Sequence, residues 1–164
     1  MASIVSTYTG TLPRQEKAKF DRVGKPLGSR GALECLIVSG NNSRRETLSR
    51  AATESGWSSV VCGDSDTARH MASRIAVKLA IVDLEKCSPA DLGGLRDLSA
   101  ELTRLGGPLL VVCGTDGDAQ QEIWARQLGA WLYLPGMAGV DAMATLCGEA
   151  RQVVEKSNSN GFGH

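Results

Sequence analysis

The sequence predicts an α/β fold: a single doubly wound domain in which helices cover both faces of a parallel sheet. Three observations predict it. The apolar residues switch repeatedly between the spacing of strands and the spacing of helices. The strand-like runs are continuously apolar, as in strands that are buried on both faces. Five strand–helix units follow one another with short connections between residues 34 and 155, an order that right-handed crossovers turn into a three-layer sandwich.

The first two units are compact. Residues 36–38 are a buried strand, and we expect Ser43 to cap a helix that ends at Glu54, because a serine hydroxyl can accept a hydrogen bond from the first turn of a helix. Residues 58–62 form the second strand. A helix over residues 66–76 follows it, with apolar residues at helical spacing.

The third unit carries the strongest helix signal. Residues 78–83 are an apolar strand that ends in Asp83, and Ser88-Pro89 then supplies a capping serine followed by a proline at the first helical position. Leucines recur at spacings of three and four up to residue 105. Gly93-Gly94 weaken the early turns by about 1 kcal/mol each relative to alanine, so we expect the regular helix to begin after them.

The last two units complete the sheet. Residues 108–113 form the fourth strand, and the helix over 118–128 is expected to pack Ile123, Trp124 and Leu128 inward. Residues 131–134 form the fifth strand, and the final helix is expected over residues 140–156.

The expected strand order is 2-1-3-4-5. In that order the first and third strands are neighbours, so the loops after Val38 and Asp83 open side by side at the switch point of the sheet. Any chemistry is expected at this edge.

Composition limits the classes of function. The chain has 164 residues with 42% hydrophobic content, enough for one core, and 18 basic residues balance 18 acidic residues. Neither nucleic acid nor a membrane is therefore an expected partner. No long apolar run and no signal segment is visible, which predicts a cytoplasmic protein. The five cysteines form no Cys-x-x-Cys pair, so we expect neither a zinc cluster nor a disulfide framework.

The domain is expected to cover residues 34–155. Residues 1–33 are rich in polar residues and basic side chains and are typical of a flexible leader, and residues 156–164 are typical of a flexible tail. Because no output domain follows, the sequence predicts a stand-alone domain.

Residues 34–155 resemble a response-regulator receiver domain of the CheY-like type. The resemblance is carried by Leu79-Ala80-Ile81-Val82-Asp83-Leu84, similar to the strand with the phosphoacceptor aspartate, and by Leu128-Gly129-Ala130-Trp131-Leu132-Tyr133-Leu134, similar to the segment that opens the fifth strand. The resemblance implies the flavodoxin-like receiver fold and a place in two-component or phosphorelay signalling. It makes Asp83 the phosphoacceptor position.

The other functional positions of a receiver domain are degenerate here. In the family, an acidic pair after the first strand holds Mg²⁺, a Ser or Thr ends the fourth strand, and a Lys follows the fifth. The matching positions are Ser39 and Gly40 for the acidic pair, Cys113 for the hydroxyl and Gly136 for the lysine. Aligning Pro135 with the family's proline moves the lysine position to Leu134, which is also uncharged. The aromatic switch position is matched by Tyr133.

These replacements predict a pseudo-receiver. Phosphoryl transfer depends on positioning and charge neutralisation, and Mg²⁺ requires hard oxygen ligands. We expect Asp83 to be a lone anion with uncharged neighbours, with no efficient metal-dependent phosphorylation, no catalytic residue, no bound metal and no cofactor. Alternatively, Asp83 caps the following loop, or it accepts phosphate through a variant site.

The expected function is binding to another signalling protein, either a kinase, a regulator or a second copy of the chain. The predicted interaction face combines the fourth helix, the fifth strand and the fifth helix, and would present Trp124, Trp131 and Tyr133. A small cofactor-binding protein of the flavodoxin type is a further alternative. Its weak signal is Gly40-Asn41-Asn42-Ser43, which could place backbone donors near a phosphate.

Overall fold

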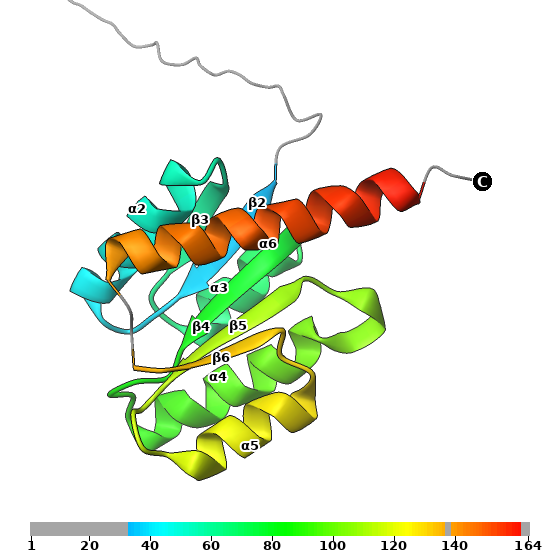
Figure 1. Cartoon of the computed structure of the whole chain (residues 1–164). Coiled ribbons are helices and arrows are strands. Elements are labelled where there is room, and N and C mark those ends of the chain that lie inside the picture. The colour runs from blue at the N-terminus through cyan, green and yellow to red at the C-terminus, as the bar shows by residue number, and fades with distance from the viewer. Residues whose placement is uncertain (1–32, 137–138, 162–164) are drawn as a thin grey trace, which may run out of the picture. The chain divides into compact units, whose positions relative to one another are not determined.

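The computed structural model of the chain describes residues 33–136 and 139–161. Within them, five parallel strands form one sheet in the order β3-β2-β4-β5-β6 (Figure 1). Counted along the chain from the first strand, this is the order 2-1-3-4-5, so the predicted fold class and strand order are confirmed. The strands are β2 (Glu34–Val38), β3 (Ser58–Cys62), β4 (Val77–Asp83), β5 (Leu109–Gly114) and β6 (Leu132–Pro135).

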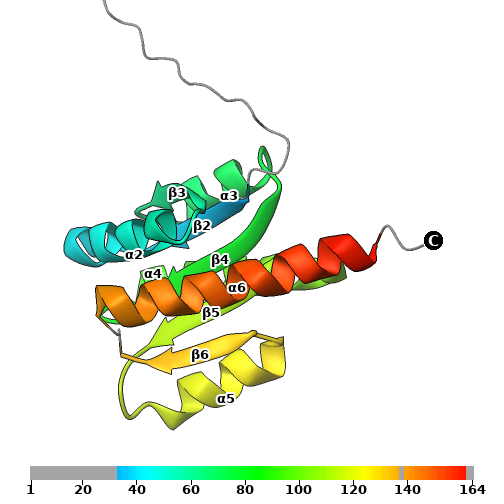
Figure 2. The same cartoon turned by 45° about the horizontal axis from the view of Figure 1, so that its top comes forward.

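Helices cover both faces of the sheet. Helices α2 and α6 lie on one face, and α3, α4 and α5 lie on the other, as the two views show (Figures 1 and 2). A short 3-10 helix over Arg104–Gly106 follows α4. The helices are α2 (Asn42–Glu54), α3 (Ser65–Ala72), α4 (Pro89–Leu102), α5 (Ala119–Leu128) and α6 (Val140–Asn160).

Side-chain caps set where four helices begin. The side chains of Asn41, Asp64, Ser88 and Asp118 each accept a hydrogen bond from a backbone N–H in the first turn of the helix that follows. The predicted start at Ser88-Pro89 is confirmed. The predicted cap at Ser43 is wrong, because Asn41, two residues earlier, caps α2.

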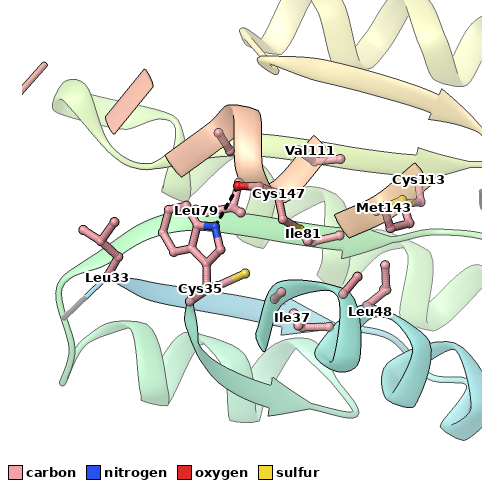
Figure 3. Packing of buried hydrophobic residues seen from close by; sticks show 14 of the residues in the cluster. Leu33, Cys35, Ile37, Leu48, Leu79, Ile81, Val111, Cys113, Met143 and Cys147 are labelled. Carbon is pink, nitrogen blue, oxygen red and sulfur yellow. Dashed lines mark hydrogen bonds between the residues drawn. The ribbon is translucent and has the colours of Figure 1, made fainter. Parts of the chain in front are cut away.

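A buried tryptophan, Trp57, contributes a hydrogen bond to the layer formed by α2 and α6. The Trp57 indole Nε1 donates to the Cys147 carbonyl oxygen at 2.8 Å, and the dashed line in Figure 3 marks this bond among the buried side chains. Trp57 follows α2, whereas Cys147 lies in the middle of α6. The bond therefore links the turn after α2 to α6 and satisfies the only polar atom of a buried indole.

Several predicted boundaries and orientations need correction. Helix α4 runs through Gly93-Gly94 without a break: Ser88 caps its first turn, and its buried leucines begin with Leu95, directly after the two glycines. Helix α6 continues to Asn160, so the predicted tail is helical over residues 156–160. Ile123 is 47% exposed, since the inner stripe of α5 passes through Gln121 and Ala125. Helix α3 ends at Ala72, where the chain turns toward β4.

Some predictions fall outside the described residues. The basic side chains of the leader, between residues 17 and 30, and His164 at the end of the chain both lie there. In the part of the chain that the structure describes, no helix combines the length and the apolar character that crossing a membrane requires.

Candidate functional site

Asp83 lies at the carboxyl end of β4, and its side chain is 1% exposed. Its two carboxylate oxygens accept four hydrogen bonds: two from the Arg44 guanidinium, one from the Ser39 hydroxyl and one from the Glu85 backbone N–H. An ionised carboxylate offers about four lone-pair sites. The Asp83 carboxylate is therefore saturated by the protein itself.

Arg44 provides the strongest of these contacts. Its Nε lies 2.5 Å from Asp83 Oδ2 and its Nη2 lies 2.7 Å from Oδ1, a bidentate arrangement. Its third nitrogen, Nη1, lies 2.5 Å from Glu85 Oε1. The hydrogen bond to Asp83, together with the charges of Asp83 and Glu85, raises the pKa of the Arg44 guanidinium against the opposing effect of burial.

The expectation that Asp83 has only uncharged neighbours is thus wrong. Arg44 belongs to the first turn of α2, where Arg44 N donates to the Asn41 side chain at 3.0 Å. The parallel pairing of β2 with β4 brings this turn beside the end of β4. Matching the functional positions of receiver domains to the sequence does not find Arg44, because this cation comes from a helix outside those positions.

One sequence signal could have identified Arg44. The positive end of the helix dipole lies at the helix N-terminus, so cations there are unfavourable by about 0.3–1 kcal/mol. The first turn of α2 nevertheless holds Arg44 and Arg45, and no acidic residue. Two arginines at this unfavourable end of the helix, next to the loop that faces Asp83, indicate that nearby hydrogen-bond acceptors compensate for their position.

The two positions of the expected acidic pair behave differently. The Ser39 hydroxyl is fully buried, accepts from Asn41 N at 3.2 Å and donates to Asp83 Oδ2 at 2.7 Å. Gly40 is exposed, and a Cβ built on it would have open space around it. Of the pair, only Ser39 reaches the aspartate, and it does so as a hydrogen-bond donor.

Cys113, the predicted hydroxyl position, lies near the end of β5 and is directly paired with Asp83 across the sheet. The thiol is fully buried, and burial, reinforced by the nearby Asp83 charge, raises its pKa to about 12. The Cys113 carbonyl oxygen accepts from Leu84 N at 2.8 Å. A buried neutral thiol is a weak donor, so this position supplies no strong hydrogen bond to an anion.

Gly136 is the predicted lysine position, and its backbone conformation explains why the residue is glycine. Its φ is 79°, in the left-handed region that favours glycine. Its N–H donates to the Gly114 carbonyl oxygen at 2.7 Å, which ties the end of β6 to β5. A lysine here would be strained, so the position serves the turn and supplies no cation. The alternative position, Leu134, is half-buried.

Tyr133 is held inside the protein beside a buried amide. Its side chain is 6% exposed, and its hydroxyl donates to Gln121 Oε1 at 3.3 Å. The same oxygen accepts from Thr115 N at 2.7 Å. A Cβ on Gly114 would overlap both the Tyr133 hydroxyl and Gln121 Oε1, so glycine makes room for this arrangement. Burial raises the pKa of the Tyr133 phenol.

The predicted interaction face needs correction in its composition. Tyr133 is buried and cannot contact a partner in this conformation. Trp124 is half-buried between α4 and α5, with the Arg96 guanidinium 5.0 Å from its ring centroid, and Trp131 packs against the core on the α6 side. The three aromatic residues therefore do not form one exposed patch.

The residues present do not fit the divalent cation that a receiver fold implies. Both oxygens of Asp83 already accept the Arg44 guanidinium, and Glu85 is engaged by the same group. The acidic-pair positions carry a serine and a glycine. No cluster of three metal-ligating side chains was found among the described residues.

A cleft of about 180 Å³ lies at the same edge of the sheet. It is bounded by the loops that follow β2, β3 and β4 and by the first turns of α4. Ligand sites for cofactors occupy about 300–1,000 Å³, so the cleft is small for a flavin. Its lining residues are Gly40, Asn41, Gly63, Asp64, Ser65, Glu85, Lys86, Cys87, Asp91 and Leu95.

The comparisons with known proteins bear on the fold. No family model and no curated protein matches the sequence. A response regulator receiver domain protein from Methanospirillum hungatei JF-1 matches with a TM-score of 0.66 at 13% identity, covering 77% of this chain and 98% of that chain. The signal receiver domain of a putative Luxo repressor protein from Vibrio parahaemolyticus matches with a TM-score of 0.66 at 16% identity, covering 81% and 99%.

A third solved structure has higher identity. The REC domain of AraT, a response regulator from Geobacillus stearothermophilus, matches with a TM-score of 0.63 at 20% identity, covering 77% of this chain and 98% of that chain. At these identities the likeness shows the fold alone. The described part of the chain has the fold of the CheY-like response-regulator receiver domains.

Proposed function

We propose that the protein is a receiver-like module of two-component or phosphorelay signalling that acts by binding another signalling protein, without efficient Mg²⁺-dependent phosphorylation. The proposal rests on the receiver fold together with a degenerate phosphorylation site. Asp83 takes the position of the phosphoacceptor, but this protein uses its carboxylate to bind Arg44.

The saturation of the Asp83 carboxylate is the observation that carries the proposal. Attack on a phosphoryl donor requires a free oxygen lone pair, and each Asp83 oxygen already accepts two hydrogen bonds. The guanidinium must leave before either oxygen becomes nucleophilic. Breaking a buried ion pair in this way leaves an uncompensated charge and is strongly unfavourable.

The side of the site that faces β5 and β6 supports the same conclusion. A transferred phosphoryl group needs donors and cations around its oxygens. At the corresponding positions the protein offers the neutral thiol of Cys113 and the left-handed Gly136. The flavodoxin-type alternative has less support, because the cleft is small and Asn41 uses its side chain to cap α2.

Incubation with Mg²⁺ and acetyl phosphate, followed by intact mass spectrometry, tests the phosphorylation part. We expect no added phosphoryl group under conditions that label a phosphorylatable receiver domain in parallel. A single phosphoryl group that disappears in the Asp83→Asn variant would instead establish the alternative, a functional receiver with a variant site.

Affinity capture tests the binding part. Trp131 is half-buried beside the edge strand β6, with α5 and α6 on either side, and remains the best candidate for a partner contact. We expect the Trp131→Ala variant to bind a signalling protein that the wild type captures, but with an affinity at least tenfold lower. The matched control is His70→Ala, because His70 is exposed on α3, on the other side of the sheet from α6. Equal retention by the two variants would contradict this interaction face.

A further inference from the structure

Three charged groups meet at the switch point of the sheet. The Arg44 guanidinium lies between two carboxylates and uses all three of its nitrogens, two on Asp83 and one on Glu85. The side chains of Arg44, Asp83 and Glu85 are 13%, 1% and 19% exposed. The guanidinium is therefore enclosed between the acids, with little access to solvent.

Arg44 is also held there against a local preference. It sits in the first turn of α2, where the helix dipole disfavours a cation. Its neighbour Arg45 turns to a different acceptor, donating to the Ser39 carbonyl oxygen at 2.6 Å. Of these two adjacent arginines, Arg45 thus binds a backbone carbonyl at the end of β2, and only Arg44 binds the carboxylates.

We propose that the Arg44 guanidinium is a tethered substitute for the divalent cation that the receiver fold implies, and that it excludes such a cation from Asp83. Removing the guanidinium then exposes a latent cation site formed by Asp83, Glu85 and the Ser39 hydroxyl. The inference deepens the proposed function, on which it rests, because it names the group that keeps the degenerate site closed.

The charges favour this assignment. Asp83 and Glu85 carry two negative charges, and Arg44 supplies one positive charge between them. Without Arg44, two carboxylates and a hydroxyl would remain around the vacated volume, all of them hard oxygen ligands of the kind that Mg²⁺ and Mn²⁺ prefer. With Arg44 present, a divalent cation would have to displace a bidentate ion pair and lie beside a fixed positive charge.

Binding of Mn²⁺, measured by electron paramagnetic resonance and by the shift in Tm, tests the proposal. The variants are Arg44→Ser and the milder Arg44→Gln, which keeps the first three side-chain carbons in case the serine variant does not fold. We expect both to bind Mn²⁺ at least tenfold more tightly than the wild type, and to gain Tm when Mn²⁺ is added.

Two controls locate the site. Arg45→Ser removes the same charge from the same turn, and it is expected to leave Mn²⁺ binding as weak as in the wild type. Adding Asp83→Asn to Arg44→Gln is expected to abolish the gain. The proposal is overturned if the wild type binds Mn²⁺ as tightly as Arg44→Gln, or if Arg44→Gln binds no better than Arg45→Ser. Either result leaves the acetyl phosphate and capture experiments free to succeed, so the two failures are distinguishable.

Discussion

Two buried polar side chains lie on strands on either side of β5, and the protein satisfies them in different ways. Asp83 on β4 is held by charge, with a guanidinium on both of its oxygens. Tyr133 on β6 is held by a neutral hydrogen bond to the Gln121 amide and by the space that Gly114 leaves open. β5, which ends in Cys113 and Gly114, separates the two.

The difference shows where the charge of a receiver-like site lies in this protein. A buried carboxylate must be paired with a cation, whereas a buried phenol needs only one hydrogen bond. Helix α2 supplies the cation for Asp83, while the loops after β5 and β6 supply none at the positions compared, Cys113 and Gly136. Positive charge therefore lies on the α2 side of Asp83, and the positions compared on the side toward Tyr133 carry no cation.

The largest expected effect comes from removing the cation that pairs with Asp83. Arg44→Met keeps much of the side-chain volume but leaves Asp83 buried without its cation. Removing one partner of a buried ion pair typically costs about 3–5 kcal/mol. We expect a loss near 3 kcal/mol in the free energy of unfolding, measured by urea denaturation, because Arg44 keeps some contact with solvent.

The ion pair between Arg69 and Glu101 is the matched control. Its 2.7 Å contact has similar length, but its side chains are 42% and 44% exposed. Exposed pairs contribute about 0–1 kcal/mol, so Arg69→Met is expected to have a small effect. Equal losses in the two variants would show that the burial of Asp83 adds nothing to the value of its partner.

Much of the fold could be predicted because its signals are local. Continuous apolar strands, a capping Ser88 before Pro89 and the change of period between elements each depend on a few neighbouring residues. The errors arose where tertiary packing decides. Ile123 has the residue type of a core position, yet α5 is rotated so that Gln121 and Ala125 face inward.

The site was less predictable because its central contact joins residues 39 positions apart. The identity of Asp83 and the absence of the acidic pair could be found by matching motifs. Arg44 could not, because this cation comes from α2 and lies at none of the motif positions that were matched. Gln121 was likewise missed, because an amide inside an amphipathic helix has the pattern of a surface residue until its burial is seen.

A single added methyl group at Gly114 is expected to disrupt the packing of Tyr133 against Gln121. Gly114 does not have a left-handed backbone, so alanine is compatible with its conformation. The added Cβ would overlap the Tyr133 hydroxyl and Gln121 Oε1, however, and one of them must move. Overpacking of this kind typically costs about 1–3 kcal/mol. We expect Gly114→Ala to lower the free energy of unfolding by that amount.

The same substitution should also release the β5–α5 loop, which hydrogen exchange of the Thr115 amide reports, because that amide donates to Gln121 Oε1. Gly40→Ala is the control, since its Cβ would meet no atom within 4 Å. Tyr133→Phe removes only the phenolic hydrogen bond and is expected to cost about 0.5–1.5 kcal/mol. If Gly114→Ala left stability and Thr115 exchange as unchanged as Gly40→Ala does, Tyr133 would be free to leave its buried position. The side of the sheet edge that holds Tyr133 would then be able to change conformation, while the Arg44–Asp83 ion pair would stay in place.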